Sequence, residues 1–161
     1  MNGCFFYIIL TAHYIVYGDG LVKILGYGIT INPKKRSKQY SDHTGTEQEF
    51  TMLFYGKREE IKTLESIIKQ RVASKTHKIY GEPVEWISPS AGMTVADLNE
   101  LVRDTIKQEN FNSISILNEN YLPFNNLDHH SNITLKEMAS NPDKYLTKIL
   151  TKNKKSVKIK S

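Results

Sequence analysis

The chain has 161 residues, enough for one domain with a core and a modest extension but not for two full domains. Apolar residues make up 39% and charged residues 24%, which excludes a chain that is disordered throughout. The formal net charge of +5 favours a polyanionic partner. The single cysteine, Cys4, excludes a disulfide framework and a cysteine zinc site, and it suits a reducing cytoplasm.

The N-terminal segment predicts a hairpin followed by a helix. Phe5–Tyr17 is rich in β-branched and aromatic residues, which predicts a strand. The apolar segment Met1–Tyr17 has no positive n-region and is shorter than the roughly 20 residues that span a bilayer, so we expect neither a signal peptide nor a membrane segment. Residues 18–20, Gly-Asp-Gly, predict a tight turn into a second strand, Leu21–Thr30. Asn32 and Pro33 then predict a helix N-cap and first helical position.

The middle of the chain alternates strand and helix patterns. Phe50–Tyr55 predicts a third strand, and Arg58–Val72 predicts a helix with one apolar stripe. The stripe consists of Ile61, Leu64, Ile68 and Val72. A short extended segment, 78–87, surrounds Trp86, which we interpret as a core anchor. Thr94 with Asp97 predicts a capping box at the start of the next helix.

Composition shifts after about Lys107, where asparagines become frequent. We therefore expect a domain at 1–107, followed at 108–161 by a polar linker, a helical extension and a basic tail. Thr134 predicts a helix cap, and Pro142 either interrupts that helix or starts another through Leu150. The tail lysines are Lys152, Lys154, Lys155, Lys158 and Lys160. We expect the tail to be mobile and either solvated or in contact with phosphates.

These patterns predict an α+β fold. We expect a small three-stranded sheet, mixed or antiparallel, flanked by helices and followed by a helical C-terminal extension.

Several residues stand out on these elements. Phe5-Phe6-Tyr7 opens the first strand, Gly28-Ile29-Thr30 closes the second, and Asn32-Pro33-Lys34-Lys35-Arg36 begins the helix. Glu65 lies on the next helix and Glu85-Trp86-Ile87 follows. Over about residues 3 to 90 this set resembles the GIY-YIG nucleases, most of all the phage and viral branch whose second motif reads roughly Lys-Ile-Gly-x-Thr.

The resemblance implies an endonuclease that cuts DNA with one divalent ion, Mg²⁺ or Mn²⁺. The expected compartment is the cytoplasm, which would be that of a host cell for a phage or viral source. Tyr7 would take the first-motif tyrosine, Gly28 the second-motif glycine, Arg36 the helix arginine and Glu65 the metal-binding glutamate. Tyr40 occupies the place of a family histidine or tyrosine. DNA would be contacted by the tail lysines and also by Lys34, Lys35 and Lys38.

The residue chemistry suits those roles. A guanidinium offers a fixed fork of donors to phosphate oxygens and does not lose its charge. Magnesium is commonly held by one or two carboxylates together with phosphate and water. A tyrosine, either Tyr7 or Tyr40, would act as base only where nearby cations lower its pKa from about 10.

The chain departs from the family pattern at both motifs. Phe5 and Phe6 replace the glycine and isoleucine of the first, and Gly26 falls on the tyrosine of the second. A bulge at Gly26 would turn the neighbouring Tyr27 into the site. The alternative function is a degenerate module of this type that binds nucleic acid or a host protein without cutting.

Two other patterns carry less weight. Adjacent histidines such as His129 and His130 point apart on a loop, which favours a surface pair over a metal site. The glycines around Asp19 have no phosphate-loop lysine, so we expect no nucleotide-binding loop there.

Overall fold

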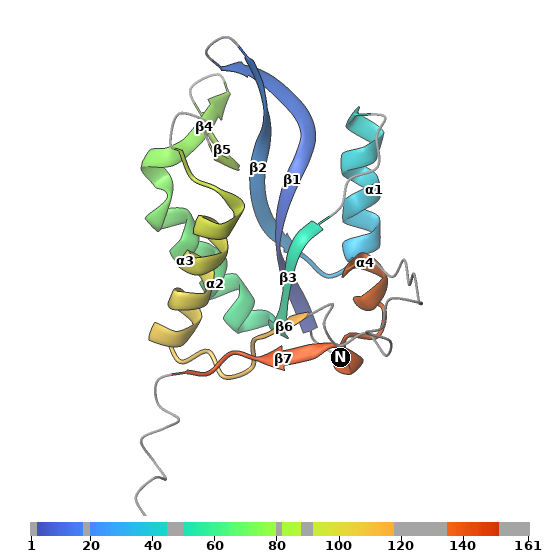
Figure 1. Ribbon diagram of the computed structural model, residues 1–161. Coiled ribbons are helices and arrows are strands. Elements are labelled where there is room, and N and C mark those ends of the chain that lie inside the picture. The colour runs from blue at the N-terminus through green and yellow to red at the C-terminus, as the bar shows by residue number, and fades with distance from the viewer. Residues whose placement is uncertain are drawn as a thin grey trace, which may run out of the picture.

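The sheet at the centre of the protein has helices on both faces (Figure 1). The structure is a computed structural model that describes residues 3–17, 20–44, 50–79, 82–87, 92–117 and 135–151. In that part of the chain seven strands pair in the order β4-β5-β2-β1-β3-β6-β7, and every pairing is antiparallel. The α+β class is therefore confirmed. The expected sheet of three strands is too small, because short segments extend both edges.

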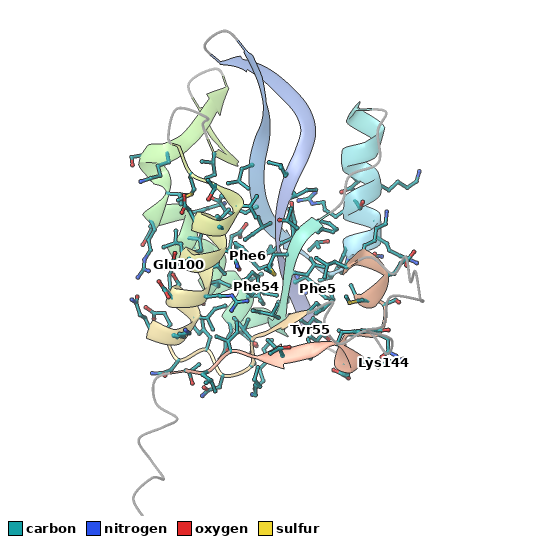
Figure 2. The ribbon with its side chains drawn as sticks, in the orientation of Figure 1. Phe5, Phe6, Phe54, Tyr55, Glu100 and Lys144 are labelled. Carbon is teal, nitrogen blue, oxygen red and sulfur yellow. The ribbon has the colours of Figure 1, made fainter. Side chains whose placement is uncertain are left out.

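The three central strands are β1 (Gly3–Tyr17), β2 (Gly20–Thr30) and β3 (Phe50–Lys57). Successive side chains of a strand point to opposite faces. Phe6 of β1 accordingly lies in one core cluster, with Phe54, and Phe5 lies in the other, with Tyr7 (Figure 2). The register between β1 and β2 shifts only between Leu10 and Tyr14. Phe5–Leu10 therefore pairs regularly with Leu25–Thr30.

Helices α2 (Arg58–Arg71) and α3 (Val95–Gln108) cover one face of the sheet (Figure 1). Their buried side chains include Ile61, Leu64, Ile68, Leu98, Val102 and Ile106. The apolar stripe expected on α2 is confirmed. The capping box is confirmed as well, since Thr94 Oγ1 accepts from the Asp97 amide at 3.0 Å and Asp97 Oδ2 accepts from the Thr94 amide at 3.0 Å.

Helices α1 (Pro33–Thr44) and α4 (Leu135–Met138) lie on the other face (Figure 1). The Lys35 amide donates to Asn32 Oδ1 at 3.1 Å, which confirms Asn32 as the cap of α1. Ser37 turns inward and is buried, whereas the lysines of the helix are exposed. One side of α1 thus packs against the rest of the protein, and the other side is exposed to solvent.

Four short strands complete the sheet, namely β4 (Thr76–Ile79), β5 (Glu82–Ile87), β6 (Ser115–Leu117) and β7 (Leu146–Lys148). Short 3-10 turns occupy Ala73–Lys75 and Pro142–Lys144. The expectation of a helix through Leu146 to Leu150 is wrong. The backbone of residues 146–148 instead pairs with β6, whose edge would otherwise present unpaired amides and carbonyls.

The segment after Lys107 contributes to the core as well as to the sheet. Ile114, Ile116 and Ile149 belong to the same cluster as the helices α2 and α3. The expected division of the chain at this residue stays a prediction, and the extension is mostly strand and turn rather than helix where the structure describes it. Within the described ranges no helix has the length and apolar character needed to cross a membrane.

Candidate functional site

Arg36 and Tyr7 are in direct contact on the face that α1 covers. Arg36 Nε donates to Tyr7 Oη at 3.1 Å, and the guanidinium carbon lies 5.8 Å from the centre of the tyrosine ring. Arg36 Nη1 also donates to Gln39 Oε1 at 3.1 Å, so the guanidinium is held at two points. Two residues that the family resemblance identified, 29 positions apart in the chain, are therefore brought together by the fold.

Tyr7 is fully buried, with 0% of its surface exposed. Its ring packs against Phe50, with the two ring centres 5.2 Å apart. A buried aromatic residue of this kind fixes the position of the group that it contacts. In this conformation Tyr7 positions Arg36, and it does not itself reach the surface.

The exposed side of α1 is strongly basic. Lys34, Lys35 and Lys38 are exposed, Arg36 is half-buried, and the first turn contains no acidic residue. We call these four residues the α1 basic surface. The amide groups at a helix N-terminus carry a partial positive charge, which here adds to the charge of the side chains. Anions such as phosphate are the ligands that this combination attracts.

Tyr27 is not part of this surface. Gly28, not Tyr27, is the cross-strand partner of Tyr7, and β1 and β2 pair without interruption there. Tyr27 is buried in the opposite cluster, stacked on Phe6 with ring centres 5.9 Å apart. The expected bulge at Gly26 is absent from the described strand, so the prediction that Tyr27 joins the site is wrong. The period of two along β2 sends its side chain to the other face.

Glu65 also belongs to the other face. It lies half-buried on α2, next to Leu64 in the chain, and its charge acts on Cys4, a residue of the α2–α3 cluster. Because α1 and α2 flank opposite faces of the sheet (Figure 1), Glu65 does not join the pair of Tyr7 and Arg36. The resemblance implies one site that contains Tyr7, Arg36 and Glu65, and this expectation is wrong, because the apolar stripe of α2 packs on the other face of the sheet and Glu65 lies on that helix.

The donor set for a metal ion is accordingly incomplete around Arg36. The described residues contain no group of three or more histidine, cysteine, aspartate or glutamate side chains that would hold a metal. A single carboxylate can bind Mg²⁺ when the substrate phosphate supplies further ligands. Glu65 does not fit that arrangement for a phosphate at Arg36, since the sheet separates the two helices.

Other predicted residues fall outside the part of the chain that the structure describes. The backbone of Tyr40 lies on α1, one turn beyond Arg36, but its side chain is outside the described part. The tail lysines from Lys152 to Lys160 are outside it too, as are His129 and His130.

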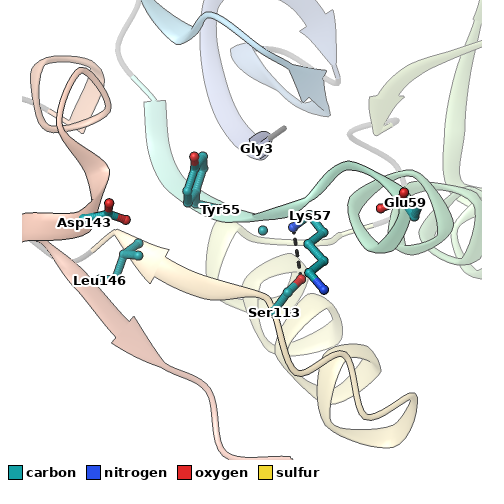
Figure 3. Close-up of a pocket in the computed structure, with 8 residues that line it drawn as sticks. Gly3, Tyr55, Lys57, Glu59, Ser113, Asp143 and Leu146 are labelled. Carbon is teal, nitrogen blue, oxygen red and sulfur yellow. Dashed lines mark hydrogen bonds between the residues drawn. The ribbon is translucent and has the colours of Figure 1, made fainter. Parts of the chain in front are cut away.

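A cavity that the sequence did not indicate lies beside Tyr55, between the start of α2 and strand β7 (Figure 3). It has a volume of about 550 Å³ and is lined by Gly3, Tyr55, Gly56, Lys57, Glu59, Ser113, Asp143 and Leu146. Asp143 and Leu146 stand on one side of it and Glu59 on the other, with Tyr55 between them (Figure 3). We call this cavity the Tyr55 pocket. Its lining comes from four separate segments, which explains why no sequence motif marked it.

Tyr55 lies against β1 at the edge of this pocket. Its ring centre is 4.6 Å from that of Phe5, its cross-strand partner, and a Cβ atom at Gly3 would collide with the tyrosine ring. Burial, together with the nearby Asp143 carboxylate, raises the pKa of Tyr55 above 10.0, so the hydroxyl stays protonated at neutral pH. The one signal in the sequence was a glycine at the start of a strand rich in aromatic and β-branched residues.

A second, smaller cavity of about 360 Å³ connects this region to α1. It shares Gly3 and Tyr55 with the first, and its lining includes Ile31 and Arg58. Ile31 is 66% exposed and directly precedes the cap of α1. The smaller cavity therefore extends from Tyr55 to the residue that precedes the cap of α1.

Comparison of the chain with models of protein families, with curated proteins and with solved structures found no match.

Proposed function

We propose that the chain acts on DNA as an endonuclease of the GIY-YIG type, with Arg36 as the group that binds the phosphate. The contact between Arg36 and Tyr7 is the observation that carries the proposal. It joins two residues, 29 positions apart in the chain, that the family resemblance assigned to one site. It also places a guanidinium, which keeps its charge, in a defined orientation within a basic surface.

The lysines of the α1 basic surface support DNA as the substrate. Lys34, Lys35 and Lys38 are exposed around Arg36 on a single helix. Lysines in this position neutralise backbone phosphates and steer the polyanion to the surface without reading its sequence. Specificity would then come from other parts of the protein.

Dependence on Mg²⁺ or Mn²⁺, with Glu65 as a ligand, is proposed from the resemblance alone. The position of Glu65 on α2 does not support a site shared with Arg36. The cytoplasm, of a host cell for a phage or viral source, is the compartment we propose, because the only thiol of the chain is buried and unpaired.

A second candidate function is binding of nucleic acid, or of a host protein, without cleavage. The burial of Tyr7 favours it. A general base must come within hydrogen-bonding distance of the water that it activates, and Tyr7 reaches no solvent in this structure. Under this alternative Arg36 contacts phosphate and no bond is broken.

A plasmid-nicking assay with and without Mg²⁺, run beside a binding assay, distinguishes the two. The variants are Arg36→Ala, Glu65→Ala and, as a charge-matched control, Lys107→Ala, an exposed residue on α3. Loss of nicking in Arg36→Ala but not in Lys107→Ala supports the endonuclease. Absence of nicking in all proteins, with DNA binding that depends on Arg36, supports the second candidate. Equal DNA binding by Arg36→Ala and wild type would reject both.

Glu65→Ala tests the metal separately. If Glu65 binds the ion, this variant should lose Mg²⁺-dependent nicking and keep its thermal stability, because removing a half-exposed carboxylate leaves no cavity. Unchanged nicking by the purified variant would show that Glu65 is not a ligand.

A further inference from the structure

We infer that the Tyr55 pocket receives one unstacked nucleobase of the strand whose phosphate is bound at the α1 basic surface. This inference rests on the proposed action on DNA and names the form of the substrate. DNA-acting enzymes that bind a single base outside the helix hold it by stacking and by hydrogen bonds to its edge.

The central strand β1 contacts both sites. Phe5 and Tyr7 are on the same face of β1, two residues apart, which corresponds to roughly 7 Å along a strand. Phe5 packs against Tyr55 at the pocket, and Tyr7 holds Arg36. The wall of the pocket and the phosphate-binding guanidinium are therefore linked through one rigid segment of the central strand.

The lining of the pocket suits a base better than a phosphate. Tyr55 and Leu146 supply an aromatic ring and an aliphatic side chain, and bases stack on aromatic side chains whatever their sequence. Of the charged residues that line the pocket, Glu59 and Asp143 outnumber Lys57, and this net negative charge disfavours a phosphate inside it. The same carboxylates accept hydrogen bonds from the amino groups of adenine or cytosine.

Positive charge lies on the side of the pocket where the phosphate would be. Arg58 lines the smaller cavity with Ile31, which leads to the cap of α1. The volume of the Tyr55 pocket, about 550 Å³, falls within the range of roughly 300–1,000 Å³ typical of small-molecule sites. A neutral planar base in the pocket and its phosphate outside would thus match the distribution of charge.

The test uses the full chain and a DNA duplex that carries 2-aminopurine, whose fluorescence rises when the base leaves the stack. Binding of the wild-type protein should raise the fluorescence. Leu146→Trp, which fills the pocket from β7, should abolish that rise and weaken binding about tenfold, the size of effect expected for one base–aromatic stack. Leu150→Trp is the matched control, because Leu150 is 69% exposed and does not line the pocket.

Two more variants serve if Leu146→Trp fails to fold, and one outcome distinguishes this inference from the proposed function. If Leu146→Trp melts below the Leu150→Trp control, Tyr55→Ala and Tyr55→Phe take its place, and only the first should lose the rise. DNA bound through Arg36 with no fluorescence rise in the wild type would overturn the base-binding inference and leave the proposed function intact.

A further experiment tests whether the pocket binds a base within DNA or a free nucleotide. In the absence of DNA binding by the wild type, the proposed function and this inference both fail. Titration with dAMP, followed by NMR, then shows whether the pocket takes a free nucleotide. Saturable dAMP binding that Leu146→Trp removes, without binding of DNA, would assign the pocket to a free nucleotide instead.

Discussion

Cys4 shows how the environment of one side chain controls its chemistry. Only 2% of its surface is exposed, and its thiol lies 3.7 Å from the Thr30 carbonyl oxygen. Burial raises the pKa of the Cys4 thiol above 9.0. Because the thiolate is the reactive form, we expect the folded protein to react with a disulfide reagent far more slowly at pH 8 than the urea-unfolded protein. Equal rates in the two states would show that this part of β1 opens readily.

The raised pKa of Cys4 also predicts a dependence of stability on pH. The folded state keeps the proton of this thiol to a higher pH than the unfolded state does. Its contribution is therefore complete below the ordinary pKa near 9 and is lost as the pH rises through the folded pKa. Urea unfolding between pH 7 and 10 should show a smaller loss of stability in Cys4→Ala than in wild type, since the variant has no thiol to ionise.

Tyr7 and Arg36 allow a test of the hydrogen bond between them. Tyr7→Phe removes the acceptor of Arg36 Nε and keeps the ring, so we expect a loss of stability on the order of 1 kcal/mol in urea unfolding. Tyr145→Phe is the control, because Tyr145 is buried in the same cluster and lies near Lys144 rather than Arg36. DNA binding should weaken in Tyr7→Phe but less than in Arg36→Ala. Unchanged DNA binding in Tyr7→Phe would mean that Tyr7 does not position Arg36.

At the scale of the elements, α3 depends on its capping box. Thr94→Ala removes the acceptor of the Asp97 amide at the start of the helix. Such a change costs about 1 kcal/mol, and α3 packs on α2 through Arg71, whose Nη1 donates to Thr105 at 3.0 Å. We therefore expect a lower midpoint of urea unfolding for Thr94→Ala. Ser66→Ala, at an exposed position on α2, should leave the midpoint within error.

For the whole molecule, the segment after Lys107 decides whether the sheet is stable. It contributes β6 to the edge of β3 and places Ile114 and Ile116 in the core. A chain ending at Lys107 should lose cooperative unfolding, because that edge and its apolar surface would be exposed. A fragment 1–107 that melts like the full chain would instead support the division at this residue.

Buried residues that follow β7 locate a second truncation. Thr151 is buried and its Oγ1 donates to Asn112 Oδ1 at 3.0 Å. Deletion from Lys152 onward should leave the melting temperature unchanged, whereas deletion from Ile149 onward should lower it, because Ile149 packs in the core. The shorter deletion should also flatten the slope of log affinity for DNA against log salt by close to one unit for each lost phosphate contact. Wild-type affinity and slope would indicate a tail that is only solvated.

Local chemistry explains what the sequence determined by itself. The cap at Asn32, the stripe on α2 and the box at Thr94 each depend on residues within about three helical turns of one another, and all three agree with the structure. The α+β class follows from the same alternation of patterns. The contact of Arg36 with Tyr7 was anticipated only through the family resemblance, which placed both at one site.

Long-range packing decided the rest. Whether residues 146–148 extend a helix or pair with β6 depends on an open strand edge that a local pattern cannot reveal. The face on which Tyr27 and Glu65 lie follows from strand register and from the side on which α2 packs. The Tyr55 pocket exists only where four segments meet. The sequence alone therefore determined the three central strands, the helices α1, α2 and α3 and the basic side of α1. Only the tertiary structure decided the edge of the sheet formed by β6 and β7 and which side chains share a face, because both depend on pairings between residues far apart in the chain.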